Sequence, residues 1–303
     1  MRKSNRQTSI AIVTRCRQKE LIRCLLSINL QTILPQEIII IDNDPQQSAR
    51  KISNLARFKS LPLKYLSSSK NVPGCRNLAL QECKTRYLGF VDDDCVLTSR
   101  WLENGFENIT TFKKAYVLGS TFLYNKNNIF ALAAHARDTF WKKYNYKYNQ
   151  ISEIFDTKNV ILDLKIIKSK NLRFDEKCQF KTYDSADFDF GFQLKSKQLS
   201  GNFCHQMKLF HQETSSFGRF IDRAYARGYL AVYINDKWEL NHRLINKRDA
   251  SFILWLLRSL KHFVNDYWKY SFFMDNSFIK RVVATLLIKV FERKYVLGYM
   301  EKK

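Results

Sequence analysis

The chain has 303 residues, of which 45% are apolar, and its 51 Lys and Arg against 28 Asp and Glu give a formal net charge of +23. This length and apolar content predict one large domain, or one domain with an appendage, and exclude an intrinsically disordered protein. The positive excess predicts attraction to polyanions, namely nucleic acid, anionic lipid headgroups or phosphate-bearing substrates, without selecting among them.

The termini and the cysteines bear on localisation. Residues 1–14 are basic but lack the apolar run of a signal peptide. The longest apolar runs, 252–257 and 282–288, are bounded by Lys and Arg and fall far short of the ~20 residues that span a bilayer. Seven cysteines without a Cys-x-x-Cys pair predict free thiols in a reducing cytosol. We therefore expect a cytoplasmic protein, soluble or peripheral at the inner face of the cytoplasmic membrane.

Hydrophobic patterning predicts alternating strands and helices over the first 112 residues. Several strands are apolar on both faces, which is typical of a mostly parallel sheet covered by helices on both sides. Ligands bind beyond the carboxyl ends of the strands of such sheets. The predicted strands are 8–14, 37–41, 63–67 and 87–91, and the predicted helices are 18–32, 72–83 and one that Ser99 could cap.

The rest of the chain is harder to divide. Residues 103–158 are aromatic and rich in Lys and Asn, and no division into elements follows from their pattern. From about 241 the chain becomes basic and helical, with apolar side chains on one side. We expect a catalytic domain at 1–240 and a basic amphipathic helical region at 241–303. The apolar faces of that region could rest on an anionic membrane, on the catalytic domain, or on another subunit of a homo-oligomer.

Three stretches carry residues suited to binding a nucleotide. Asp92, Asp93 and Asp94 follow a buried strand, and a turn of this kind could hold Mg²⁺ or Mn²⁺ or simply favour the start of the next helix. Asp42 could bind a base or ribose, or could form a turn. Arg76 and its neighbour Asn77 open a helix, where Arg could clamp a phosphate or be solvated.

These stretches occur in an order and spacing that resemble family 2 glycosyltransferases. The match covers residues 8–112 well, through 9–28, 37–50, 71–82 and 87–102, and continues more weakly over 159–229. The resemblance implies the GT-A fold, a Rossmann-like nucleotide-diphospho-sugar transferase fold with a mostly parallel mixed sheet flanked by helices, here followed by a C-terminal helical appendage.

The resemblance also implies roles for individual residues. Asp94 would be a metal ligand, with His211 or Glu213 as a further ligand. Asp187 would be the general base, the alternative being a place in the first turn of a helix that Ser185 could cap, and the Glu that precedes this Asp in the family is Ala186 here. Cys16 stands where relatives have Asn. The implied donor-binding residues are Thr14, Arg15, Arg17, Asp42, Arg76, Asn77, Asp92 and Asp93.

The implied chemistry is displacement at an anomeric carbon with inversion. The donor would be a UDP-, GDP- or dTDP-sugar, the cofactor Mn²⁺ or Mg²⁺, and the acceptor a hydroxyl of a saccharide or lipid-linked molecule in bacterial cell-surface polysaccharide or lipopolysaccharide synthesis. A nucleotidyltransferase is a rival, but it would ordinarily have a Gly-rich loop after the first strand, and residues 14–21 contain no Gly. A nucleic-acid-binding protein is a second rival, yet no RNP, zinc-finger or helix-turn-helix signature is present, so we expect no nucleic-acid partner.

Overall fold

The computed structural model describes residues 3–148, 155–240 and 251–302. The chain divides into two compact units that alternate along the sequence. The first unit holds residues 1–122, 155–177 and 186–211, and the second holds residues 123–154, 178–185 and 212–303. The predicted boundary between 240 and 241 adjoins residues 241–250, which lie outside the described residues, and it stays a prediction.

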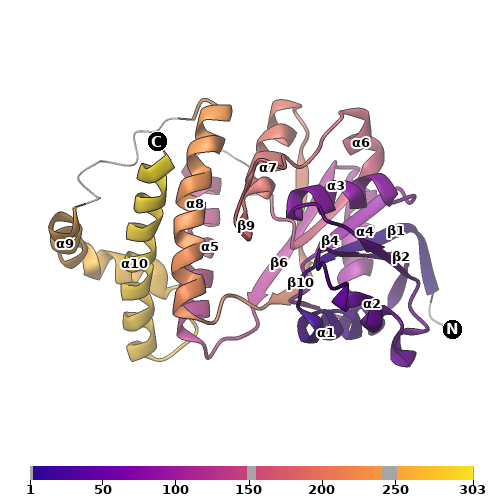
Figure 1. Ribbon diagram of the computed structural model, residues 1–303, viewed down its shortest axis with the longest axis horizontal. Coiled ribbons are helices and arrows are strands. Elements are labelled where there is room, and N and C mark those ends of the chain that lie inside the picture. Colours follow the sequence, from indigo (N-terminus) through magenta and orange to yellow (C-terminus); the bar gives the residue numbers. More distant parts are fainter. Residues whose placement is uncertain (1–2, 149–154, 241–250, 303) are drawn as a thin grey trace. The chain divides into compact units, whose positions relative to one another are not determined.

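A single mixed sheet organises the first unit (Figure 1). Four neighbouring strands, β3-β2-β1-β4, are parallel, whereas β7 pairs antiparallel with both β4 and β6, and β10 pairs antiparallel with β5. The predicted mostly parallel mixed sheet is therefore confirmed. The full strand order is β3 (Leu63–Ser67), β2 (Ile33–Asp42), β1 (Lys3–Thr14), β4 (Tyr87–Val91), β7 (Asn159–Asp163), β6 (Tyr116–Leu123), β10 (Gly201–His211) and β5 (Cys95–Leu97).

The central strands are buried on both faces, as their unbroken apolar runs predict. Side chains at 10–12 on β1 and at 38–41 on β2 are fully buried, which removes apolar surface from water on both sides of the sheet. Helices supply the covering layers. They are α1 (Gln18–Asn29), α2 (Ser48–Ser53), α3 (Val72–Glu82), α4 (Trp101–Phe112), α6 (Leu164–Ser169) and α7 (Ala186–Ser196), with a 3-10 turn η1 at Ala56–Phe58.

The start of α4 differs from the prediction that Ser99 caps it. Arg100 occupies the N-cap position and makes no side-chain cap hydrogen bond. Instead, the side chain of Gln31, just beyond the end of α1, accepts a hydrogen bond of 3.0 Å from the amide of Leu102. An unpaired amide of the first turn is thus satisfied by a residue 71 positions away, which local pattern cannot foresee.

The second unit is mainly helical. Figure 1 shows α8 (Phe217–Lys237) and α10 (Phe278–Lys302) side by side, and both contact α5 (Ile129–Tyr148). The unit also contains α9 (Phe252–Ser271) and a short hairpin of β8 (Gln179–Phe180) and β9 (Tyr183–Asp184). The expected C-terminal helices are therefore present. The stretch 103–158 that resisted division contains most of α4, all of β6 and α5, and residues outside the described part.

Two sets of contacts hold these helices together. At the crossing of α8 and α10, Gly228 lies against the Tyr295 carbonyl and Gly298 against the Tyr225 carbonyl, so closely that a Cβ on either glycine would overlap backbone oxygen. Beside this crossing, the Asp138 carboxylate of α5 receives a bidentate pair of hydrogen bonds from Arg227, at 2.7 and 2.9 Å. The backbones therefore meet where side chains are absent, and one buried carboxylate joins α5 to α8. Within the described residues, no helix combines the length and apolar character needed to cross a membrane.

Candidate active site

The three consecutive aspartates form the turn between β4 and β5. Every residue of β4 is buried, and the Cys95 amide closes the turn by donating to the Asp92 carbonyl at 3.1 Å. Asp93 and Asp94 are only 3% and 6% exposed. Since ionised carboxylates are costly to bury without partners, the surroundings of this turn decide what it can do.

Residues at the end of β1 supply two of those partners. Thr14, the last residue of β1, donates from its hydroxyl to Asp93 Oδ2 at 2.7 Å. Arg17 bridges two aspartates, with Nη1 at 3.0 Å from Asp93 Oδ1 and at 2.6 Å from Asp94 Oδ2. The parallel pairing of β1 with β4 explains this meeting, because it brings the carboxyl ends of both strands to one edge of the sheet. The predicted residues Thr14, Arg17, Asp93 and Asp94 are thus brought together.

The electrostatics of the turn differ among its carboxyls. Burial raises the pKa of Asp93 to about 7, with the Asp94 charge adding to the rise and Arg17 and Thr14 opposing it. Burial and Asp94 also raise the pKa of Asp92, against the charges of Arg76, His211 and Lys158. The crowded carboxylates therefore favour any ligand that brings positive charge.

Strand pairing brings a histidine to the same turn. β10 runs antiparallel to β5 with His211 opposite Cys95, and His211 Nε2 lies 3.2 Å from Asp94 Oδ1. One ligand atom from each of Asp92, Asp94 and His211 lies within 4.8 Å of the others. That spread is close to what one divalent cation with bonds of about 2.0–2.2 Å requires. The donor set of two carboxylates and one imidazole fits such an ion.

Glu213, the alternative ligand, is engaged elsewhere. It belongs to the second unit, where its carboxylate pairs with Arg223 and its backbone is held by the Asn125 carboxamide on both sides. His211, by contrast, has its Nε2 atom 3.2 Å from Asp94 Oδ1 and is the better candidate for the further ligand.

Asp42, expected to contact the nucleotide, is fully buried. Its Oδ1 accepts from the Asp44 amide at 3.0 Å, and its Oδ2 accepts from the Ala49 amide at 2.9 Å and the Tyr65 hydroxyl at 3.1 Å. These bonds fix the loop after β2, which is the turn-forming role that the sequence also allowed. Binding of a base or ribose by Asp42 stays a prediction.

At the start of α3, as at Asp42, side chains make hydrogen bonds that stabilise the local fold. Asn77 donates to the Phe174 carbonyl and accepts from the Phe174 amide, both at 2.8 Å. Asn71 caps the helix by accepting from the Gly74 amide at 3.0 Å, and a Cβ on Gly74 would crowd that cap and Glu176. Arg76 is buried, with its guanidinium 5.7 Å from the centre of the Phe174 ring. The positive charge of Arg76 opposes the rise in the pKa of Asp92.

Lys158 is a cation near the turn that sequence reasoning missed. It pairs with Asp156 at 2.5 Å, its carbonyl accepts a hydrogen bond from the Cys95 thiol at 3.9 Å, and its charge lowers the pKa of Asp92. It precedes β7, in the stretch that no pattern divided, so its position became evident only from the antiparallel pairing of β7 with β4.

Two predicted residues lie apart from these contacts. Arg15 is exposed just after β1. Asp187 lies in the first turn of α7, half-buried, where its Oδ1 accepts from the Phe188 amide at 2.9 Å. The same turn contains Asp189, which is fully buried and accepts from Gln193 at 2.7 Å. The role of Asp187 as a base stays a prediction.

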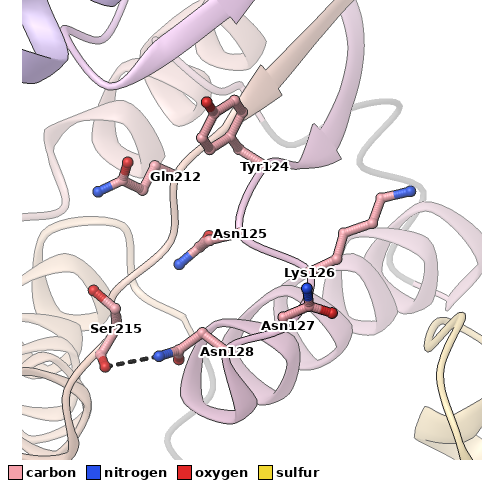
Figure 2. A pocket seen from close by; sticks show the side chains of 7 residues that line it. All are labelled: Tyr124, Asn125, Lys126, Asn127, Asn128, Gln212 and Ser215. Carbon is pink, nitrogen blue, oxygen red and sulfur yellow. Dashed lines mark hydrogen bonds between the residues drawn. The ribbon is translucent and has the colours of Figure 1, made fainter.

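The second unit contains an open polar pocket of about 670 Å³ (Figure 2). Two of its amides have structural tasks, since Asn125 holds Glu213 and Asn128 donates to the Ser215 carbonyl at 2.9 Å. Gln212 directly follows His211 in the chain. The lining residues are Tyr124, Asn125, Lys126, Asn127, Asn128, Gln212 and Ser215.

Comparison with known proteins supports the fold and the family. Structures of S. aureus TarS 1–349 in complex with UDP-GlcNAc and with UDP are 13% and 14% identical to this chain, with TM-scores of 0.54 and 0.53, and each match covers 98% of this chain and 92% of that one. A longer TarS structure matches with 13% identity and a TM-score of 0.54, over 97% of this chain and 55% of that one. At such identities the likeness shows the fold alone.

A search of curated proteins finds no match. The family model described as glycosyl transferase family 2 matches residues 9–173, which is more than half of the chain. Together with the observed fold, this match identifies the chain as a glycosyltransferase that belongs to glycosyl transferase family 2.

Proposed function

We propose that this enzyme transfers a sugar from a UDP-linked donor to a hydroxyl of a saccharide or lipid-linked acceptor, with inversion at the anomeric carbon. The observation that carries the proposal is the convergence of the acidic turn, His211 and Arg17 at one edge of the sheet. A nucleoside diphosphate bound there would meet both a cation site and basic side chains. UDP as the carrier is supported by the TarS structures in complex with UDP and UDP-GlcNAc.

Asp92, Asp94 and His211 would hold a divalent cation, and Mn²⁺ suits this mixture of carboxylates and imidazole better than Mg²⁺ does. When bound, the cation would offset the negative charge that grows on the leaving diphosphate. Arg17 would then give up its bonds to Asp93 and Asp94 and turn toward the diphosphate, because the cation replaces its charge.

The remaining steps belong to side chains. Asp187 would accept the proton of the acceptor hydroxyl as its oxygen attacks the anomeric carbon. Arg76 and Lys158, whose charges already act on Asp92, would stabilise the phosphate oxygens. Because Arg76 is buried and held over the Phe174 ring, it needs little reorganisation to do so.

The polar pocket of the second unit is our candidate for a saccharide-binding site. Amide, hydroxyl and aromatic side chains line it, and these groups suit the many hydroxyls and the apolar ring faces of a sugar. None of the seven cysteines, which all lie in the described part of the chain, forms a disulfide, and this supports a reducing, cytoplasmic setting for the reaction. An acceptor of bacterial cell-surface polysaccharide or lipopolysaccharide synthesis would be available there.

A panel of nucleotide sugars, assayed with Mn²⁺ for donor hydrolysis and for transfer to acceptors, tests the proposal. We expect UDP-sugars to be consumed by the wild type, and Asp187→Asn to bind the donor normally while losing turnover. Full turnover by Asp187→Asn would overturn the role of the base, and consumption of nucleoside triphosphates instead of nucleotide sugars would overturn the reaction itself.

A further inference from the structure

An exposed apolar face runs along α9. Among the described side chains of α9, seven large apolar ones are between 40% and 71% exposed. Five of these follow a spacing of three or four residues, which aligns them on one face of a helix. These five are Ile253, Leu257, Leu260, Val264 and Trp268, and the other two are Leu254 and Leu256.

The face continues onto the first turns of α10. Phe278 and Ile279 are each more than two-thirds exposed, and Val283 and Leu286 are also exposed. The ring of Tyr267 on α9 lies edge-on to the ring of Phe278, with centres 5.7 Å apart, so the two exposed segments adjoin. Contiguous exposed apolar patches on a protein surface mark interaction sites.

The opposite side of α9 is occupied, which fixes the exposed face outward. Tyr270 is fully buried and donates from its hydroxyl to Glu292 of α10 at 2.7 Å. The ring of Trp255 lies under the guanidinium of Arg293, at 5.5 Å. The helix is therefore anchored to α10 on one side and apolar on the other.

Charge on α9 is one-sided. Arg258 and Lys261 are exposed at the edge of the apolar face. The sole acidic residue of α9 is Asp266, which lies toward α10 and pairs there with Lys289. The apolar face thus has basic side chains beside it and no carboxylate of its own helix.

We propose that the face formed by α9 and the start of α10 binds an anionic lipid bilayer, with α9 lying in the headgroup region parallel to the surface. A helix of 20 residues covers about 30 Å of that surface. The apolar side chains enter the boundary of the acyl chains, Trp268 lies at headgroup depth, and Arg258 and Lys261 meet lipid phosphates.

Charge decides between a bilayer and a second copy of the chain. A symmetric dimer through this face would place Arg258 and Lys261 of one copy near the same residues of its partner, because such an interface uses the same patch twice. Anionic lipid complements these charges instead. The inference is independent of the donor site and goes beyond sugar transfer, so its failure would leave the proposed reaction untouched.

Flotation of the full chain with vesicles of phosphatidylcholine, with and without phosphatidylglycerol, tests the inference. We expect the wild type to float with the anionic vesicles and to partition weakly onto the neutral ones. Leu260→Ser with Val264→Ser should lower partitioning onto anionic vesicles about tenfold or more, since two apolar groups no longer enter the bilayer. Arg258→Gln with Lys261→Gln should lower it about 25-fold, at about fivefold for each charge lost, and high salt should remove that difference.

The matched control is Leu30→Ser, because Leu30 is equally exposed but lies in the sheet unit, and it should float like the wild type. All four altered side chains of α9 are exposed, so circular dichroism and melting temperature should stay unchanged. Equal flotation of the wild type and both double variants would overturn the inference. A wild type that binds no vesicles would also overturn it. If that wild type sediments as a dimer, and Leu260→Ser with Val264→Ser dissociates the dimer, the face is an interface between copies.

Discussion

Removal of the Arg17 guanidinium tests how the acidic turn is balanced. Arg17→Met keeps most of the apolar stem but leaves Asp93 and Asp94 without the bonds of 3.0 and 2.6 Å. Hydrogen bonds to charged groups contribute about 1.5–3 kcal/mol each, but the Arg17 side chain is 45% exposed, so solvent screening reduces the total. We expect the metal-free variant to be about 1–3 kcal/mol less stable than the wild type.

Divalent cation should then rescue the variant. Because the cation proposed for Asp92, Asp94 and His211 would supply the charge that Arg17 provides in its absence, Mn²⁺ should raise the melting temperature of Arg17→Met more than that of the wild type. Differential scanning fluorimetry with and without Mn²⁺ measures both quantities. Arg15→Met is the control, since Arg15 is exposed two residues earlier and its loss should change neither. Equal metal-free stability of Arg17→Met and wild type would refute the reasoning.

Three further predictions concern the helical unit and the missed cation. Asp138→Asn should cost about 3–5 kcal/mol, because it leaves buried arginines without their carboxylate. Burial raises the pKa of Asp138, yet Arg227 and Arg223 hold it below its ordinary value, so the wild type keeps this stabilisation above about pH 4 and loses it as the pH falls further. Gly228→Ala should destabilise the α8–α10 crossing by about 1–3 kcal/mol, since the added Cβ meets backbone. Lys158→Met should raise the KM for the donor about tenfold or more, since Lys158, whose charge acts on Asp92, is proposed to stabilise the phosphate oxygens.

Each of these variants has a matched control. For Asp138→Asn, the measurement is the midpoint of urea unfolding at neutral and acid pH. The control Asp222→Asn removes an exposed carboxylate of α8 and should leave that midpoint and its dependence on acid pH unchanged. Gly218→Ala adds a Cβ that meets nothing within 4 Å on the same helix, so it should be neutral or stabilising in thermal melts. Lys165→Met removes an exposed charge of α6 and should leave steady-state kinetics alone. Any control as damaging as its partner would contradict the corresponding contact.

The sequence was informative where one physical requirement dominates. Strands β1 and β2 are buried on both faces, so their apolar runs predicted them directly. The acidic turn after β4 stood out because three adjacent carboxylates repel one another, but the turn by itself left a metal site and a helix start as alternatives. The family resemblance implied that Thr14 and Arg17 bind the donor, but it did not predict their hydrogen bonds to that turn.

Other features depend on contacts that sequence does not display. The cap of α4 comes from Gln31, and α5 buries a run of alanines, Ala131, Ala133, Ala134 and Ala136, whose small side chains give little periodic signal. Lys158 reaches the site only through the antiparallel pairing of β7. The bonds by which Asp42 fixes its own loop are likewise not displayed by the sequence, and its binding of a nucleotide stays a prediction.

The central claim is that a nucleoside diphosphate binds at the turn of Asp92, Asp93 and Asp94. Isothermal titration of UDP into wild type and Asp94→Asn, each with and without Mn²⁺, measures this most directly. We predict that UDP binds the wild type with an affinity that Mn²⁺ strengthens, and that Asp94→Asn remains folded but loses the effect of Mn²⁺. An affinity for UDP that neither Mn²⁺ nor Asp94→Asn changes would contradict the claim.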